Sequence, residues 1–221
     1  YSELICSALL ESHGNIHKIA LDLGVKGEYR IRRLEMLFGD LNFVSTHREN
    51  SFEFTLDISQ VYFSPRLSLE RKRVHDIAKS DEKILDAFAG AAPFSVALAS
   101  KGCKVTSVDP NPAANLWSHK NFEINNIAKT NYDFINSRIE DVVSELPLYD
   151  RIIMNHPTKS LNYLEILSKK LNTKGTLHLY AIVEKGDNFQ VNKYLNSDFK
   201  CIFEREVHAY SPQSSLKVFD I

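Results

Sequence analysis

From residue 83 onward the sequence alternates short apolar runs with longer segments of helical periodicity. This alternation constrains the fold most, because strands that alternate with helices form a parallel sheet covered by helices on both faces. We predict strands at 83–90, 104–112, 132–136, 149–155 and 175–183, and helices at 91–101, 113–125, 137–145, 161–171 and 189–196. The last two strands, 200–208 and 216–221, have no helix between them, so they should form an antiparallel hairpin that closes the sheet.

The first 60 residues differ from this pattern and predict a small α+β module. Residues 52–58 alternate apolar with polar side chains after Arg48-Glu49-Asn50, which indicates a β-hairpin over 42–59. Upstream we expect a strand at 16–23 and a short helix at 31–38.

A connecting segment should join the two parts. Pro65 ends a short strand, and Ser68 can cap the helix that follows. We therefore divide the chain into a small module at 1–60, a strand-turn-helix connection at 61–80 and an α/β domain at 81–221.

Composition excludes several classes of protein. The chain has 221 residues, 43% hydrophobic and 25% charged, which is typical of a folded globular protein. With 27 Lys and Arg against 28 Asp and Glu, a nucleic-acid partner would need a local basic patch. Three widely spaced cysteines indicate a reducing, cytosolic compartment, and His13 and His17 have no evident third ligand, so we predict no metal site. We expect neither a membrane span nor a signal peptide, because no apolar run reaches about 18 residues and the first residues lack a basic start.

The turn after the first of these strands is the first candidate site. In DAFAGAAPF, Gly90 allows close backbone approach, and Asp109 ends the next strand nineteen positions later. This spacing is typical of a carboxylate that accepts hydrogen bonds from a ribose. Because a dinucleotide turn normally carries several glycines, we predict S-adenosylmethionine as the cofactor. The alternative is that Asp109 caps a helix and Gly90 serves only the turn.

Asn155, in MNHP, follows another strand of the sheet. Ligands of such sheets lie at the carboxyl ends of the strands, and an Asn amide can donate to and accept from a planar base. The alternative is a turn that simply ends the strand.

A third candidate is the basic segment in residues 62–73. Arg66 and Glu70 are four residues apart and share a helix face, and a carboxylate near cations can accept a substrate proton. The alternative is a solvated helix with an internal ion pair. Residues that could hold phosphates are Arg71, Lys72 and Arg73, with a second group of Lys26, Arg30, Arg32 and Arg33.

Taken together, VYFSPRLSLERKRV, DAFAGAAPF, VDPNP, MNHP and GTLHLYAIV resemble the archaeal and eukaryotic tRNA guanine-37 N1-methyltransferases. The resemblance covers the chain from about GEYRIRRLEMLFGD to its end. It implies a class I methyltransferase fold of Rossmann-like type, S-adenosylmethionine as cofactor, and a small preceding module that grips the anticodon stem-loop of tRNA. We expect the chain to act as a monomer.

The resemblance also implies residue roles. Glu70 matches the general base for guanine N1, Arg30 the group that stabilises charge on O6, and Asn155 the residue that positions the base. The cofactor set would be Phe88, Ala89, Gly90, Asp109, Pro110, Asn136, Ser137 and Asn155. The substrate set would be Tyr62, Arg66, Arg71, Lys72 and Pro157.

Three positions depart from the family pattern: Ala92 for a glycine, His156 for a leucine, and Asn136-Ser137 for an acidic residue near adenine. We expect the Ala92 methyl group to crowd the methionine end of the cofactor. These departures keep open a catalytically degenerate member that binds tRNA or protein. A related aminocarboxypropyl transferase of wybutosine synthesis is a further alternative, although it generally lacks Asn-x-Pro. Methylation of an exocyclic amine or of protein glutamine is another alternative. Enzymes of that kind usually have an aromatic residue after the proline, whereas this chain has Thr158.

Overall fold

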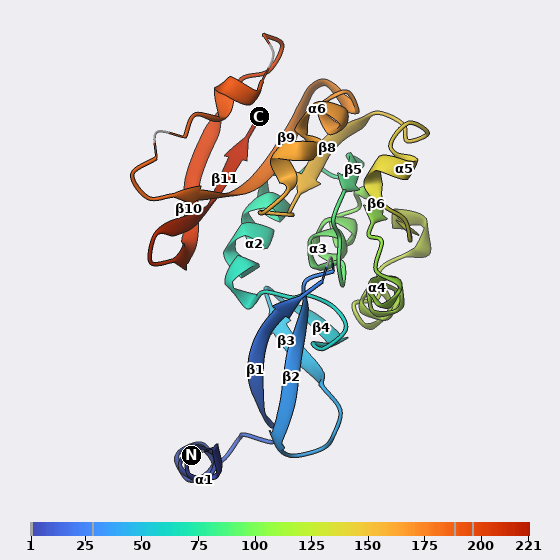
Figure 1. The fold of residues 1–221 in the computed structure, drawn as a ribbon. Coiled ribbons are helices and arrows are strands. Elements are labelled where there is room, and N and C mark those ends of the chain that lie inside the picture. The colour runs from blue at the N-terminus through green and yellow to red at the C-terminus, as the bar shows by residue number, and fades with distance from the viewer. Residues whose placement is uncertain (1, 28, 188, 196) are drawn as a thin grey trace.

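The computed structural model describes residues 2–27, 29–187, 189–195 and 197–221, and its centre is a seven-stranded sheet (Figure 1). The pairs β9–β8, β8–β5, β5–β6 and β6–β7 are parallel. Strand β11 runs antiparallel to both of its neighbours, β9 and β10. The predicted α/β fold with a terminal antiparallel hairpin is therefore confirmed. The strand order is β10 (Phe203–Ser211), β11 (Ser214–Asp220), β9 (Leu171–Glu184), β8 (Tyr149–Met154), β5 (Lys83–Asp86), β6 (Lys104–Val108) and β7 (Tyr132–Ile135).

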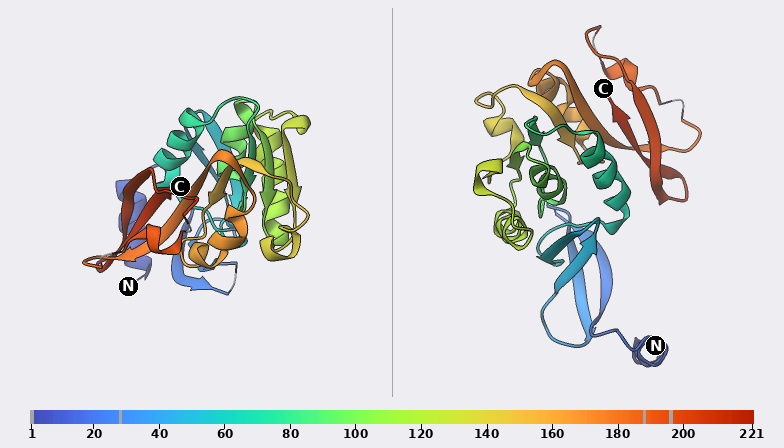
Figure 2. Two further views of the ribbon diagram at one scale, coloured as in Figure 1. Left: turned by 90° about the horizontal axis from the view of Figure 1, so that it is seen from above. Right: turned by 180° about the vertical axis from the view of Figure 1, so that it is seen from behind.

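Helices cover both faces of this sheet (Figure 2). Consecutive strand residues alternate between two apolar clusters: Ile84 packs with α2, α3 and α4, whereas Leu85 packs with α5 and α6. This alternation is expected of a sheet buried on both sides. The helices are α2 (Ser68–Ile77), α3 (Pro93–Ser100), α4 (Pro112–Ile124), α5 (Ile139–Val142) and α6 (Ser160–Ser168).

The N-terminal part extends away from the sheet (Figure 1). It contains α1 (Ser2–Ser12) and an antiparallel hairpin of β1 (Ile19–Lys26) and β2 (Ile31–Phe38). The predicted helix at 31–38 is wrong, because this segment is β2. Eight residues form a marginal helix on their own, and pairing with β1 supplies the backbone hydrogen bonds instead. The strand predicted at 16–23 lies three residues further along the chain.

The predicted hairpin at 42–59 is confirmed as β3 (Val44–Glu49) and β4 (Phe52–Asp57). It packs on the α/β body, since the Thr55 N–H donates to Asn121 Oδ1 at 2.8 Å and Phe54 is buried in the cluster that contains Ile84. The β3–β4 hairpin therefore packs with the α/β body rather than with the β1–β2 hairpin. The predicted boundary at residue 60 separates this hairpin from the body on which it packs.

The connection and the shorter helices also differ in detail. Residues 61–64 form no strand, and a 3-10 turn (Pro65–Leu67) leads into α2, so Ser68 is the first helical residue and makes no side-chain cap. The helix predicted at 137–145 shortens to α5. The one predicted at 189–196 is a 3-10 turn (Val191–Tyr194), although residues 188 and 196 lie outside the described part. A further 3-10 turn spans Lys129–Asn131. Among the described residues, no helix is both long and apolar enough to cross a bilayer.

A chain of buried charged groups joins α2 to the sheet. Arg73 donates to both Asp220 carboxylate oxygens at 2.6 and 3.1 Å, and Asp220 accepts from His178 Nδ1 at 2.6 Å. Because an arginine can only donate, Arg151 at 2.7 Å fixes His178 Nε2 as an acceptor. A nitrogen that accepts carries no proton, so the imidazole is neutral, and burial lowers the pKa of His178 in the same sense. Arg151 continues the chain to Glu82 at 2.8 Å.

A second buried polar group ties α3 to the sheet at the end of β5. Asp86 accepts from Ser95 Oγ at 2.7 Å, and Ser107 Oγ donates to Ser95 Oγ at 2.9 Å. Burial, with a smaller contribution from the charge of Asp109, raises the pKa of Asp86 to about 7. The other Asp86 oxygen, Oδ1, is buried with no hydrogen-bond partner in the part of the chain that the structure describes. Ionised Asp86 is therefore costly to bury.

This burial predicts a pH dependence of stability. The folded pKa lies above the unfolded value, so the folded state binds more protons and stability falls as pH rises from about 4 to about 7. Asp86→Asn should remove this fall, on the order of 3 kcal/mol, so the variant gains relative to wild type at pH 8 but not at pH 4. Urea unfolding of both proteins across this range measures the effect. Parallel curves for the two proteins would contradict it.

Candidate functional site

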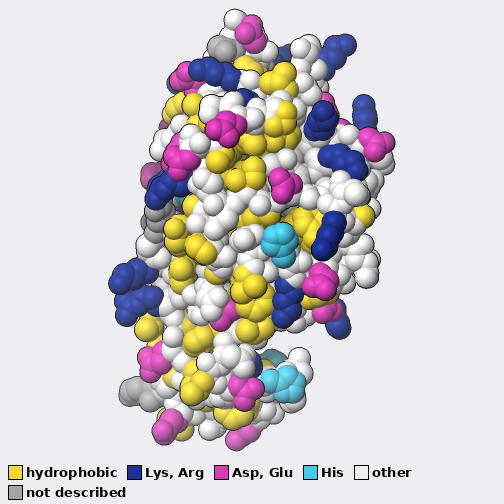
Figure 3. Space-filling model, turned by 90° about the vertical axis from the view of Figure 1, so that its right-hand side faces the viewer, with side chains coloured by type: hydrophobic (Ala, Val, Ile, Leu, Met, Phe, Trp, Pro, Cys, Tyr) yellow, Lys and Arg dark blue, Asp and Glu magenta, His cyan; other side chains and the backbone are white. Residues whose placement is uncertain are grey.

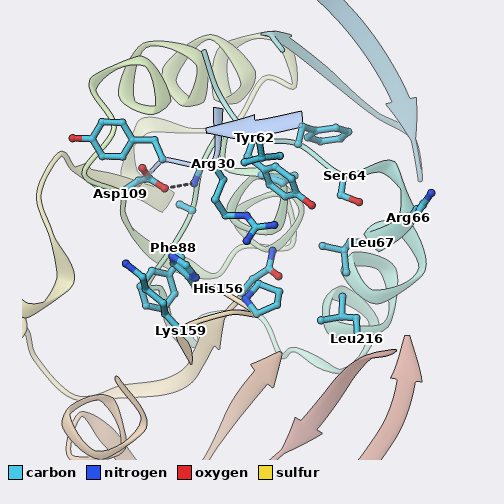
Figure 4. A pocket seen from close by; sticks show the side chains of 18 of the residues that line it. Arg30, Tyr62, Ser64, Arg66, Leu67, Phe88, Asp109, His156, Lys159 and Leu216 are labelled. Atoms are coloured by element: carbon cyan, nitrogen blue, oxygen red, sulfur yellow. Dashed lines mark hydrogen bonds between the residues drawn. The ribbon is translucent and has the colours of Figure 1, made fainter. Parts of the chain in front are cut away.

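A cavity of about 400 Å³ opens at the carboxyl ends of β5, β6 and β8 (Figure 4). Parallel strands place their carboxyl ends at one edge of the sheet, and the turns that leave those ends form the cavity floor. Its walls come from segments far apart in the chain. They are the tip of the β1–β2 hairpin, residues 62–67, the start of α6 and the β10–β11 hairpin.

Asp109 holds the predicted cofactor turn in place. Its carboxylate accepts from the Gly90 N–H at 2.8 Å and from the Asn111 N–H at 2.9 Å. Burial raises the pKa of Asp109, and these two backbone donors oppose that rise. Gly90 has a φ of +55°, a conformation that favours glycine. The nineteen-residue spacing therefore brings these residues together at the cavity, where Phe88, Ala89 and Pro110 also lie.

The other predicted cofactor residues, Asn136 and Ser137, are not among the lining residues. The Asn136 amide donates to the backbone carbonyl of Asp109 at 2.9 Å, which supports the turn from behind. The lining residues of this loop are Arg138, Ile139 and Glu140. Glu140 is thus an acidic residue that the sequence reasoning missed, because it was sought directly after the strand.

Asn155 and Pro157 line the cavity from the end of β8. The Asn155 Oδ1 atom is buried and has no hydrogen-bond partner among the described residues, which leaves a polar acceptor for a ligand. Ser160 fixes this turn, since its hydroxyl donates to the Met154 carbonyl at 2.9 Å and accepts from the His156 N–H at 3.1 Å. A simple strand-ending turn would not explain the unsatisfied oxygen.

His156 occupies the position where the family pattern has leucine. Its ring meets the Phe88 ring edge-on, with centroids 5.3 Å apart, so the imidazole packs as a flat cavity wall (Figure 4). Phe88 also contacts the Tyr163 ring at 5.2 Å. Histidine in place of leucine therefore keeps this wall of the cavity packed and adds ring nitrogen atoms to it.

Ala92 does not crowd the cavity. It is fully buried in the apolar cluster with Phe54 and Phe94, and it is not among the lining residues. The expected clash with a cofactor is therefore wrong. Alanine is instead less favourable than glycine for the backbone at this position, because Ala92, the residue that precedes α3, has a φ of +61°.

Arg30 and Tyr62 reach the cavity as predicted. Arg30 lies in the turn between β1 and β2 and extends over the cavity toward His156 (Figure 4). Its guanidinium lies 5.4 Å from the centroid of the Tyr62 ring. The small N-terminal hairpin thus contributes a cation to a site built mainly by the sheet.

The structure places Glu70 behind the cavity wall. Its carboxylate is fully buried and accepts from Arg73 Nε and Tyr180 Oη, both at 3.0 Å, and from Arg205. Leu67, one helical turn earlier on the same face, lines the cavity, whereas Glu70 does not. Glu70 forms its intrahelical ion pair with Arg73, whereas Arg66 lies in the 3-10 turn before α2. The alternative of an internal ion pair therefore holds in part, but the carboxylate is buried rather than solvated.

The basic segment divides into buried and exposed members. Arg71 lines the cavity but is buried against Glu49, with Arg71 Nη2 and Glu49 Oε2 2.6 Å apart, so a substrate could reach it only from inside the cavity. Lys72 is exposed and pairs with Asp76 at 2.6 Å. Arg66 is exposed at the outer edge of the cavity (Figure 4).

Two side chains of the terminal hairpin, His208 and Tyr210, also line the cavity and were missed. Both lie in β10, which follows the last predicted helix and carries no recognisable motif. Only the antiparallel pairing of β10 with β11 brings them to the site. Among the described residues, no cluster of three or more His, Cys, Asp or Glu could hold a metal ion.

Comparison with known proteins agrees with this geometry. The model of the TRM5/TYW2 methyltransferase domain matches residues 45–207. A tRNA (guanine(37)-N(1))-methyltransferase Trm5b of Pyrococcus abyssi is 35% identical over 190 residues, which cover 86% of this chain and 56% of the relative. The Drosophila melanogaster tRNA (guanine(37)-N(1))-methyltransferase is 33% identical over 214 residues, covering 85% of this chain and 47% of the relative.

A solved structure, the complex of aTrm5 and tRNALeu, superposes with a TM-score of 0.87 at 28% identity over 99% of this chain and 64% of that chain. The chain spans about half the length of the curated relatives it matches. The family model covers most of the chain and includes the cofactor turn, Asn155 and the strands that carry them, so the chain belongs to the TRM5/TYW2 methyltransferase-domain family.

Proposed function

We propose that this chain transfers the methyl group of S-adenosylmethionine to N1 of guanine 37 in tRNA. The observation that carries the proposal is the cavity itself, where the Asp109–Gly90 turn and the unsatisfied Asn155 oxygen face the same space as Arg30. The relatives named for this reaction, in archaea and in an insect, support it.

The residues at the strand ends fit the cofactor. Asp109 has acceptor capacity left after its two backbone bonds, so it can receive the ribose hydroxyls. The apolar lining at Phe88 and Ile139 suits a flat purine, and Glu140 and Arg138 provide polar contacts at its edge. When bound, S-adenosylmethionine supplies an electrophilic methyl group, and the chain supplies orientation and exclusion of water.

Arg30 and Asn155 suit a guanine. Methylation at N1 requires loss of the N1 proton, and negative charge then moves to O6. The Arg30 guanidinium can stabilise that charge, and the Asn155 amide can hold the base edge. Guanine 37 lies in a loop, so it can enter a pocket without breaking a helix.

Glu70 is the proposed proton acceptor, but only after it changes partners. In the buried chain, Glu70, Asp220 and Glu82 balance Arg73, Arg205 and Arg151, so an added proton would leave excess positive charge inside the protein. The Arg205 side chain is 44% exposed and is the partner that can move into solvent. We infer that Glu70 acts after Arg205 moves away.

The anticodon stem-loop of tRNA is the proposed partner, bound by a monomer in the cytoplasm. Exposed cations can contact phosphates. Arg66 lines the cavity, and Lys72, Lys26 and Arg33 are exposed next to lining residues in the sequence. The face shown in Figure 3 instead intersperses Lys and Arg with Asp and Glu. A local patch therefore suits this nearly neutral chain better than a general charge attraction.

Replacing Asp109 tests the cofactor site. Asp109→Ala should weaken S-adenosylmethionine binding by about 1–3 kcal/mol, because it removes an acceptor for the ribose and the anchor of the Gly90 turn. Calorimetry measures this, with Asp133→Ala as a control at an exposed carboxylate outside the cavity. Unchanged affinity of the Asp109 variant would contradict the assignment.

Replacing Glu70 tests the proton acceptor. Glu70→Gln should lower single-turnover methyl transfer by roughly 10²–10⁴-fold while cofactor and tRNA affinity remain. Arg205→Ala removes one partner but keeps the carboxylate, so it should retain transfer. Mass analysis of the modified nucleoside separates a methyl from an aminocarboxypropyl product. The base role fails if Glu70→Gln turns over like wild type, or if Arg205→Ala loses as much activity as Glu70→Gln.

Salt dependence tests the proposed tRNA interface. The double variant Arg66→Ala, Lys72→Ala should lower the slope of log affinity against log salt by up to about one for each phosphate that no longer meets a cation. Lys169→Ala is the matched control, since Lys169 pairs with Glu165 at 2.8 Å just as Lys72 pairs with Asp76. Equal slopes for wild type and the double variant would remove these two residues from the interface.

A further inference from the structure

The turn between β1 and β2 is connected to two segments that lie more than 120 residues further along the chain. Arg30 Nη1 donates to Thr158 Oγ1, 128 residues away, and Arg30 Nη2 donates to Tyr210 Oη, 180 residues away, both at 3.4 Å. The backbone of Arg30 has a φ of +54°, and its N–H donates to the Gly27 carbonyl at 3.3 Å. These contacts direct the side chain from the turn over the cavity.

The guanidinium is held on three sides. Thr158 lies after the Asn155 turn, Tyr210 lies in β10, and the Tyr62 ring is 5.4 Å from the guanidinium carbon. Figure 4 shows Arg30 between Tyr62 and His156, extending into the cavity. A guanidinium has five N–H donors, so two side-chain bonds leave donors that can meet a ligand acceptor.

A long side chain on a projecting hairpin needs such support to act on a developing charge. Donors stabilise a transition state best when they are already oriented before the reaction. Both hydroxyl contacts are at the long end of hydrogen-bond distances, and contacts of this kind tighten when a substrate closes the site. The two hydroxyls therefore restrict where the guanidinium can lie without consuming its capacity to bind.

We propose that Tyr210 and Thr158 are positioning residues that hold the Arg30 guanidinium over the cavity and so anchor the β1–β2 turn to the sheet domain. This inference rests on the proposed function for its catalytic consequence. Neither hydroxyl touches the reacting atoms in this role, and each acts through Arg30. The terminal hairpin thereby contributes to the reaction although it carries none of the sequence motifs.

Double-variant kinetics test the proposal. Tyr210→Phe and Thr158→Val should each lower the single-turnover rate constant for methylation of a guanine-37 transcript by roughly 3–20-fold, with little change in cofactor affinity. In an Arg30→Ala background the same changes should have no further effect, because the side chain through which they act is gone. Tyr194→Phe is the matched control, since Tyr194 is half-exposed, packs on Phe189 and lies outside the cavity.

Hydrogen exchange measures how firmly the β1–β2 turn is held, independently of methyl transfer. Amide hydrogen exchange of residues 29–32 should be faster in Tyr210→Phe than in wild type, and unchanged in Tyr194→Phe. The proposal would be overturned if Tyr210→Phe and Thr158→Val lowered the rate constant equally in the wild-type and Arg30→Ala backgrounds. Unchanged hydrogen exchange of residues 29–32 in Tyr210→Phe would also overturn it. A wild-type protein that methylates no guanine-37 transcript would overturn the proposed function alone, because the exchange difference would still report the anchor.

Discussion

The carboxylate of Asp109 is the group on which the candidate site depends. It lies at the end of β6, yet it accepts from the Gly90 N–H after β5, and the backbone carbonyl of the same residue accepts from Asn136 after β7. One residue thus links the carboxyl ends of three parallel strands. Because burial raises the pKa of Asp109 and backbone donors oppose that rise, the same bonds that shape the turn also favour the charged form that a ribose would meet.

The buried charged chain has a comparable role on the other side of the cavity. Breaking such a chain by removing one partner is costly, since the remaining charge is left without compensation in a low-dielectric interior. The chain therefore fixes α2 against the sheet and with it Leu67 at the cavity wall. The same pairing keeps Glu70 behind that wall. The proposed proton acceptance by Glu70 would therefore compete with its structural role, and the exposed Arg205 is where the two roles can be separated.

Much of this arrangement follows from local sequence patterns, and the remainder depends on contacts between distant residues. Strand-helix alternation, the Gly90 turn and Asn155 are encoded within short segments, so their places at the sheet edge were predictable. The 31–38 segment was not, because its apolar spacing suits either a helix or a strand until β1 pairs with it. The resemblance assigned Glu70 the role of general base for guanine N1. Its burial, however, depends on contacts with Tyr180 and Arg205, which lie more than 100 residues further along the chain.

The N-terminal hairpin lies over the cavity with little packing of its own. Seven of the eight β1 residues are exposed, and a two-stranded hairpin with so little burial is marginally stable by itself. Its position over the cavity therefore depends on the contacts at its turn, chiefly those of Arg30, rather than on a core of its own. Weakly held elements open at low cost in free energy, so contacts added at the same guanidinium would stabilise the arrangement of this turn. The placement of the hairpin and the orientation of the Arg30 cation therefore depend on the same few contacts.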